Sequence, residues 1–214
     1  MGIIGGTGSG KSSLVSLIPH FYDVKDGRVS VFGKNVCAYD DEDLRHRIGY
    51  VQQKAVLFQG TVRSNLLWGN DSASDDDLRT ALSTAQVLDI VADKGGLDAP
   101  VEQNGANFSG GQKQRLSVAR ALVRKPQILV LDDSSSALDY ATEAAMRKAI
   151  LALPYKPTLF IVSQRASSVM CADRILVLED GRLVGDGTHK ALLANCPAYC
   201  EIYHSQFSEE VTDA

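Results

Sequence analysis

The feature that most constrains this sequence is a glycine-rich segment at residues 5–12, which reads Gly-Gly-Thr-Gly-Ser-Gly-Lys-Ser. It matches the pattern G-x-x-x-x-G-K-[ST] in full, and it lies between a strand-like Ile3-Ile4 pair and a helix-like segment at residues 13–18. Glycines let the backbone curl until several N–H groups point at one anion, and the following helix adds its positive end. We therefore expect a phosphate-binding loop in which Lys11 reaches the β- and γ-phosphates of a nucleotide and the Ser12 hydroxyl ligates Mg²⁺.

The pattern of apolar segments predicts an α/β fold around this loop. Short apolar runs alternate with helical stretches, which is typical of a mainly parallel sheet flanked by helices. The candidate strands are residues 29–32, 48–51, 128–131, 159–162 and 175–178. The last of these leads through a Glu-Asp-Gly turn into residues 182–184, which predicts a hairpin. Residues 198–207 carry aromatic and aliphatic side chains at helical spacing and predict a helix that packs on the core.

Residues 61–125 have little strand pattern and several helical segments. Ser74, followed by three aspartates, looks like a helix start with an N-cap and acidic groups in the first turn. We expect one domain over residues 1–214, with an α/β core at residues 1–60 and 126–214. A helical subdomain at residues 61–125 would be inserted into that core.

Composition limits the partners of the chain. Hydrophobic residues make up 44% and charged residues 22%, and the formal net charge is −4, as in many globular proteins. This acidic balance argues against binding to nucleic acid. No apolar run approaches the roughly 18 residues that cross a bilayer, so we expect any membrane association to come through a partner. Of the four cysteines, Cys196 and Cys200 are one helical turn apart, with His204 one turn further, but reduced thiols are the favoured interpretation.

Asp132 directly follows the apolar run at residues 128–131. A carboxylate at the carboxyl end of a buried strand lies at the mouth of the sheet, where ligands bind in α/β folds. Together with the phosphate-binding loop, this position predicts a role in the Mg²⁺ shell.

A second motif selects one family among those with a phosphate-binding loop. Residues 108–115 read Phe-Ser-Gly-Gly-Gln-Lys-Gln-Arg. They resemble the LSGGQ signature of ABC ATPases, with Phe108 in place of the first leucine, and open a helix that carries Arg115 and Arg120. The resemblance covers nearly the whole chain and is closest to the ATPase domains of multidrug and lipid exporters. It implies an ABC transporter nucleotide-binding domain with a P-loop NTPase (RecA-like) core.

The resemblance also assigns roles to residues of this sequence. It implies ATP and Mg²⁺ as ligands, a second ABC ATPase domain and an exporter transmembrane domain as partners, and a location at the cytoplasmic face of the membrane. Residues near Glu102 resemble a segment that contacts the membrane domain. The residues implied for ATP are Gly5, Gly6, Thr7, Gly8, Ser9, Gly10, Lys11, Ser12 and Ser13. Those implied for the ATP of the second domain are the signature residues Phe108, Ser109, Gly110, Gly111 and Gln112. Gln53 of the Q-loop would join Ser12 and Asp132 at the metal, and the D-loop between the two domains would be Ser136, Ala137, Leu138 and Asp139.

Two departures from the family pattern fall on catalytic positions. Asp133 stands where the family has the glutamate that acts on the attacking water, and Gln164 stands where it has a histidine that contacts the γ-phosphate. The aspartate side chain is one methylene shorter, and a misplacement of about 1 Å can lower the rate on the order of 10²-fold. The alternative is that Asp133 works from a shifted backbone. We expect a degenerate-site subunit of a heterodimeric exporter, with Asp133, Gln164 and Gln53 as its catalytic-site residues.

The segment before the phosphate-binding loop is shorter than in the family pattern. Only residues 1–4 precede the loop, where the family has further strands and an aromatic residue that stacks on adenine, so we expect an N-terminal truncation.

Two alternative functions stay open, and a nucleotide-gated regulatory module with negligible turnover is one of them. A soluble ABC ATPase that acts on DNA or the ribosome is another. The interval between Lys11 and Ser109 has room for a small helical lobe but not for a long coiled coil, which disfavours the latter.

Overall fold

The computed structural model of the chain describes residues 1–134 and 137–207, and it divides into two compact units. The first unit comprises residues 1–41 together with the chain from Leu159 onward, and the second comprises residues 42–158. The predicted helical lobe at residues 61–125 falls entirely within the second unit. The predicted limits of the α/β core, residues 1–60 and 126–214, do not coincide with this division and stay a prediction.

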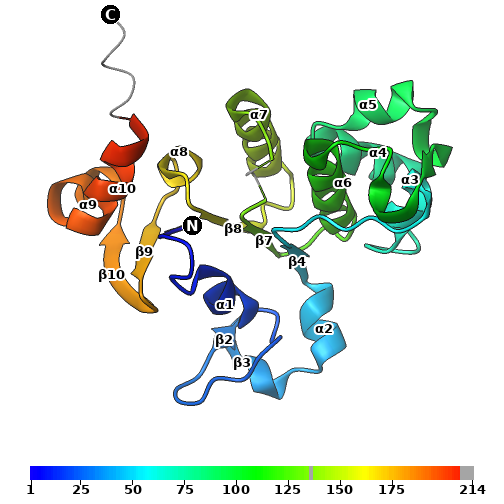
Figure 1. The fold of residues 1–214 in the computed structure, drawn as a ribbon. Coiled ribbons are helices and arrows are strands. Elements are labelled where there is room, and N and C mark those ends of the chain that lie inside the picture. Colours follow the sequence, from blue (N-terminus) through cyan, green and yellow to red (C-terminus); the bar gives the residue numbers. More distant parts are fainter. Residues whose placement is uncertain (135–136, 208–214) are drawn as a thin grey trace, which may run out of the picture. The chain divides into compact units, whose positions relative to one another are not determined.

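The first unit is built on a strand that carries the glycine-rich loop (Figure 1). Strand β1 (Gly2–Ile4) lies between β8 (Thr158–Ser163) and β9 (Ile175–Glu179) and is parallel to both. Strand β10 (Arg182–Gly187) is antiparallel to β9, so the predicted hairpin is confirmed. Its turn places Asp180 and Gly181 in the left-handed region, as a type I′ turn requires.

Helices and a small hairpin complete the first unit. Helix α1 (Lys11–Ser16) follows the loop, and β2 (Ser30–Val31) pairs with β3 (Lys34–Asn35). Helices α8 (Ala166–Val169), α9 (His189–Asn195) and α10 (Pro197–Phe207) follow β8 and β10, and α10 confirms the predicted C-terminal helix. Tyr199 of α10 is fully buried and forms a 2.7 Å hydrogen bond with His189. The predicted strand at residues 29–32 is reduced to two residues because Phe32 and Gly33 form the turn.

The second unit contains a pair of parallel strands, β4 (Ile48–Val51) and β7 (Ile128–Asp132). Every residue of β7 is buried, as expected for a continuous apolar run. Helix α2 (Asp41–His46) precedes β4, and α7 (Tyr140–Leu151) follows β7. The pairings of β1 with β8 and β9, and of β4 with β7, are parallel, which confirms the predicted mainly parallel α/β architecture.

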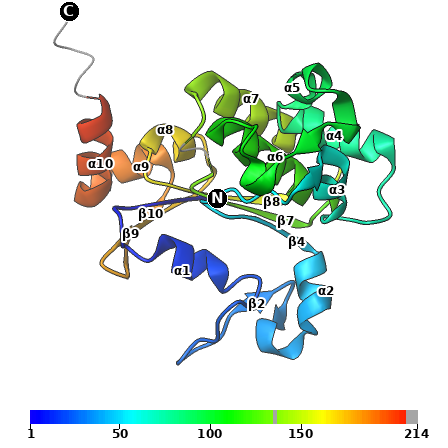
Figure 2. The same ribbon diagram turned by 45° about the vertical axis from the view of Figure 1, so that its right-hand side comes forward.

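The remaining helices of the second unit are α3 (Val62–Leu67), α4 (Asp75–Thr84), α5 (Leu88–Asp93) and α6 (Gly110–Val123), which cluster together in Figure 2. Ser74 caps α4, and its side chain and that of Asp77 bond each other's backbone N–H groups, which confirms the predicted helix start. The sequence did not predict β5 (Gly60–Thr61) and β6 (Pro100–Val101), because two-residue strands leave no periodic pattern.

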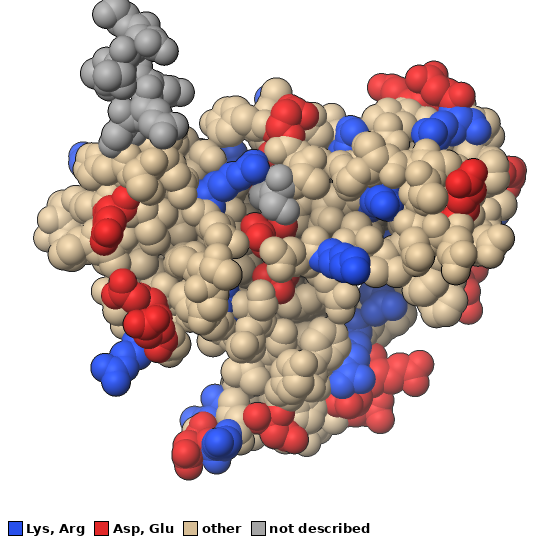
Figure 3. All heavy atoms as spheres, viewed as in Figure 1, with Lys and Arg blue, Asp and Glu red and all other residues tan. Residues whose placement is uncertain are grey.

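Charged side chains of both signs are interspersed on the face drawn in Figure 3, where no extended basic patch is visible among the described residues. Across residues 1–134 and 137–207, no helix is long and apolar enough to cross a membrane.

Candidate nucleotide-binding site

The loop at residues 5–10 has a backbone that only glycine adopts readily at several positions. Gly8 has φ of 80° and Gly10 has φ of 91°, both in the left-handed region. At Gly5 packing excludes a side chain, because a Cβ atom there would lie 2.1 Å from the carbonyl oxygen of Leu178. A Cβ atom on Gly6 would meet nothing within 4 Å. The glycines at positions 5, 8 and 10 thus fix the curled path that the sequence motif predicts.

Lys11 is folded over this loop. Its Nζ donates to the carbonyl oxygens of Gly5 at 2.8 Å and Gly6 at 2.7 Å, and to Ser9 Oγ at 3.3 Å. The side chain is buried, and these acceptors satisfy an ammonium group that would otherwise be costly to remove from water. Ser12 and Ser13 lie exposed at the start of α1. A phosphate in the loop would therefore compete with backbone carbonyls for the ammonium group of Lys11.

Gln164 directly follows β8 and lies beside the loop. Thr7 Oγ1 donates a 3.1 Å hydrogen bond to Gln164 Oε1. The backbone at this position is held from α10, since Gln206 Nε2 donates to the Gln164 carbonyl oxygen and Gln206 Oε1 accepts from the Ala166 N–H, both at 2.8 Å. The first unit therefore brings the phosphate-binding loop and Gln164 together.

The second unit gathers the other predicted catalytic and metal-binding side chains. Asp132 is buried at the end of β7, and its Oδ2 accepts a 2.9 Å hydrogen bond from Tyr50 Oη. Gln53 Nε2 donates to Asp133 Oδ2 at 3.0 Å. Tyr50 and Gln53 come from β4 and the segment after it, and the parallel pairing of β4 with β7 places both strand ends on the same edge.

Asp133 is half-buried and has φ of 46°, in the left-handed region that non-glycine residues rarely adopt. Such backbone strain is frequent at functional sites, where the surrounding structure enforces it. Its carboxylate is engaged by the Gln53 amide, so an aspartate at this position has a defined orientation.

The signature residues open the longest helix of the second unit. Ser109 caps α6, with its Oγ accepting from Gln112 N at 3.3 Å and Gln112 Oε1 accepting from Ser109 N at 3.0 Å. Ser109 and Gly110 are exposed, so the positive end of a 14-residue helix faces outward. Phe108 is buried, and the Lys94 ammonium lies 4.9 Å from its ring centroid, so the phenylalanine that replaces leucine serves packing.

The two arginines that follow in α6 bond backbone carbonyls of their own unit. Arg115 Nη1 donates to Gln86 O at 2.5 Å, and Arg120 Nη2 donates to Val56 O at 3.0 Å. Burial lowers the pKa of Arg120. These contacts hold α6 against its neighbours.

The D-loop packs on the signature. A Cβ atom on Gly111 would lie 2.8 Å from the carbonyl oxygen of Ala137 and 3.3 Å from Leu138 Cδ2. Asp139 caps α7 by accepting from Thr142 N at 2.9 Å and Thr142 Oγ1 at 2.7 Å, and these bonds lower the pKa of its carboxyl. Ser136, predicted as the first D-loop residue, lies outside the described residues.

The family of the chain follows from its similarity to known proteins. The sequence profile of the family described as "ABC transporter" matches residues 1–136, which is more than half of the chain. The chain belongs to the ABC transporter family. It is the ATP-binding domain of that family, an ATPase domain, as the signature and the phosphate-binding loop predict.

Relatives of this ABC domain are longer proteins. The chain is 46% identical over 213 residues to "Uncharacterized ABC transporter ATP-binding protein YfiB" of Bacillus subtilis (strain 168), covering 99% of this chain and 37% of the relative. It is 44% identical over 209 residues to "Uncharacterized ABC transporter ATP-binding protein Rv1273c" of Mycobacterium tuberculosis (strain ATCC 25618 / H37Rv), covering 95% of this chain and 35% of the relative. The chain thus spans little more than a third of these relatives.

A solved structure described as "Structure of a bacterial Atm1-family ABC exporter with ATP bound" matches with a TM-score of 0.92 and 36% identity. The match covers 96% of this chain and 36% of the exporter chain. This likeness confirms the predicted ABC ATPase fold.

Two positioning residues of the ABC domain have no predicted role in the sequence. Tyr50 lies three residues before Gln53, and its hydroxyl holds Asp132 across 82 positions of sequence. Gln206 braces Gln164 from the C-terminal helix, 42 positions away. Neither pairing leaves a signal in spacing or periodicity.

Proposed function

We propose that this chain is the nucleotide-dependent motor of an ABC exporter whose own site binds ATP and hydrolyses it slowly. The observation that carries the proposal is the hydrogen bond between Thr7 and Gln164, because it sets a glutamine, not a histidine, beside the phosphate-binding loop.

Residues 5–13 supply the phosphate site in this proposal. Curled backbone N–H groups and the ammonium group of Lys11 bind the terminal phosphates of ATP. Ser12, Gln53 and Asp132 offer hydroxyl, amide and carboxylate oxygens, the hard ligands that Mg²⁺ prefers. These residues would hold the ion, which supplies charge neutralisation at the phosphates when bound.

Slow turnover follows from the chemistry of two side chains. Gln164 can donate a hydrogen bond to a phosphate oxygen, but it has no titratable proton and no positive charge. Asp133 is one methylene shorter than glutamate, and its carboxylate already accepts a bond from Gln53. A base must lie within about 2.6–3.2 Å of the proton that it takes, so the shorter side chain positions water poorly.

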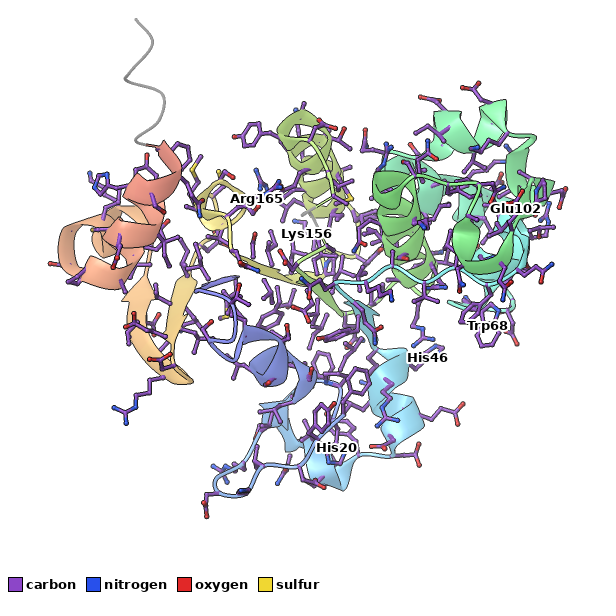
Figure 4. All side chains as sticks on the ribbon, in the orientation of Figure 1. His20, His46, Trp68, Glu102, Lys156 and Arg165 are labelled. Atoms are coloured by element: carbon purple, nitrogen blue, oxygen red, sulfur yellow. The ribbon has the colours of Figure 1, made fainter. Side chains whose placement is uncertain are left out.

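The signature serves a partner in this account. Ser109 and the exposed start of α6 would face the γ-phosphate of ATP bound by a second ABC ATPase domain, with residues 137–139 at the boundary between the two domains. The degenerate own site favours a heterodimer with a more competent partner. The helical part around Glu102, labelled in Figure 4, would contact a transmembrane domain. The chain would then act at the cytoplasmic face of a membrane and not on nucleic acid.

The same two residues favour a second candidate function, a nucleotide-gated regulatory module with negligible turnover. The two proposals differ in whether any ATP is consumed at this site. Measurable phosphate release that requires Lys11 supports the motor, and binding without release supports the regulatory module.

The test compares steady-state ATPase activity of the unmodified chain, Asp133→Glu, Gln164→His and the double variant, with Lys11→Ala as the inactive control. We expect the double variant to be faster than the unmodified chain on the order of 10²-fold. Equal activity in all four forms would show that positions 133 and 164 do not limit the site.

A further inference from the structure

A histidine, an aspartate and a cysteine, none of them assigned to nucleotide, lie close together in the first unit. His20, Asp23 and Cys37 each offer one ligand atom, and these atoms all lie within 4.8 Å of one another. His20 Nε2 is 2.9 Å from Asp23 Oδ1, and Cys37 Sγ is 3.9 Å from the same oxygen. Figure 4 labels His20 beside the β2–β3 hairpin. The mixed nitrogen, oxygen and sulfur set distinguishes this cluster from an ordinary group of surface acids.

The backbone holds these side chains in place. His20 has φ of 54°, a left-handed conformation at the end of the turn that follows α1. The backbone N–H of Cys37 donates to Asn35 Oδ1 at 3.2 Å, which caps the short 3₁₀ turn that carries the thiol. His20 and Asp23 are three residues apart, and the 3₁₀ turn after β3 brings Cys37 to Asp23 from 14 residues further along the chain.

A fourth residue orients the imidazole. His20 Nδ1 lies 2.9 Å from Asp41 Oδ1, while Nε2 points to Asp23. A histidine that binds a metal characteristically donates its other ring N–H to a carboxylate, which fixes the tautomer and raises the basicity of the ligand. The arrangement around His20 has this form.

The separations suit a small tetrahedral ion. Zinc bonds of about 2.0–2.3 Å to nitrogen, oxygen and sulfur set neighbouring ligand atoms about 3.4–3.6 Å apart. The separations of 2.9 Å and 3.9 Å from Asp23 Oδ1 bracket that range, and the ligand atoms of His20 and Cys37 lie within 4.8 Å of each other, so side-chain shifts of about 1 Å or less would suffice. Asp23 and Cys37 are exposed, which leaves room for water as a fourth ligand.

We propose that His20, Asp23 and Cys37 form a binding site for Zn²⁺, with water in the fourth position and Asp41 as a positioning residue. Binding would cross-link the segment after α1 to the turn after β3. The competing interpretation is a simple ion pair, since bonds to Asp23 and Asp41 raise the pKa of His20. Cys37 takes no part in that ion pair, so involvement of its thiol distinguishes metal binding from the ion pair.

The test uses the reduced, chelator-treated chain at mildly alkaline pH without nucleotide. Titration with Co²⁺ should give one equivalent of a tetrahedral complex with a thiolate charge-transfer band, and Zn²⁺ should displace it. Cys37→Ser should remove the band, whereas Cys171→Ser, which alters another exposed cysteine, should retain it. Asp41→Asn should weaken affinity about 10- to 100-fold.

A second measurement needs no variant and so does not depend on the folding of a mutant. Zn²⁺ should slow alkylation of Cys37 by iodoacetamide, measured by peptide mass spectrometry, while Cys171 in the same sample serves as the unprotected control. Equal alkylation of Cys37 with and without Zn²⁺, or a Co²⁺ band that survives Cys37→Ser, would overturn the proposal.

Discussion

The two glycine-rich segments that we propose as anion sites, residues 5–13 and residues 108–112, contain glycine for different physical reasons. In the first site, Gly8 and Gly10 have positive φ, so glycine permits a backbone path that other residues resist. In the second site, Gly110 and Gly111 are helical, and Gly111 is required because the carbonyl oxygen of Ala137 approaches it. Backbone conformation therefore requires glycine in the loop, whereas packing against Ala137 and Leu138 requires it in the second segment, which begins a regular helix.

The largest expected effect is the loss of ATP affinity when Lys11 of the first segment, residues 5–13, is replaced. Lys11→Ala removes charge-assisted bonds worth about 1.5–3 kcal/mol, so ATP affinity should fall about 10- to 100-fold. Equilibrium titration with a fluorescent ATP analogue measures it. Lys190→Ala, an exposed lysine on α9 in the same unit, should bind like the unmodified chain. If Ser109→Ala weakened binding by the isolated chain as much as Lys11→Ala, the assignment of the two sites would be wrong.

The next effect tests the packing reason for glycine in the signature. Gly111→Ala should lower the free energy of unfolding by about 1–3 kcal/mol, because the added Cβ meets the Ala137 carbonyl at 2.8 Å. Gly110→Ala is the matched control, since its Cβ would meet only the Ala137 Cβ at an ordinary 3.9 Å. Urea unfolding measures both, and equal destabilisation by the two changes would contradict the packing account.

A smaller effect concerns the brace between α10 and the segment after β8. Gln206→Ala removes the bonds to the Gln164 carbonyl and the Ala166 N–H and should cost about 1–2 kcal/mol of stability. Ser205→Ala, which removes a hydroxyl bonded to the Ile202 carbonyl of its own helix, is the neighbouring control. Hydrogen exchange of the segment after β8 should accelerate in Gln206→Ala only. Unchanged exchange would show that α10 does not hold Gln164.

The smallest effect is a pH dependence at the start of α7. Bonds from Thr142 lower the pKa of Asp139 below its usual value of 3.8. Stability from this cap is therefore present above pH 3.8 and is lost as the pH falls through the lowered pKa. Asp139→Asn keeps a capping oxygen without this titration, so its acid unfolding curve should be less steep. Superimposable curves for the two forms would contradict this assignment.

The sequence predicted those parts of the structure that depend on local patterns. The runs at residues 128–131, 159–162 and 175–178 became strands because each is apolar throughout and suits burial on both faces. Ser74 was predicted as a cap because a serine followed by acidic residues is a local signal of a helix start.

What the sequence could not predict depends on pairings between distant residues. The bonds from Tyr50 to Asp132 and from Gln206 to Gln164 join segments that only the fold brings together. The surroundings of the cysteines likewise depend on the fold and not on their spacing in the sequence. Cys200 Sγ lies 3.0 Å from the Leu193 carbonyl oxygen, as expected of a reduced thiol, whereas the described cluster with metal-binding geometry lies at Cys37.

The most direct measurement of the central claim follows the chemical state of nucleotide bound to the chain. Labelled ATP is bound in less than stoichiometric amount with Mg²⁺, and the bound nucleotide is identified over time by quenching and separation. The account predicts that it remains ATP in the unmodified chain long after the Asp133→Glu/Gln164→His variant has converted it to ADP. Conversion at the same rate in both forms would contradict the claim that this site binds ATP and hydrolyses it slowly.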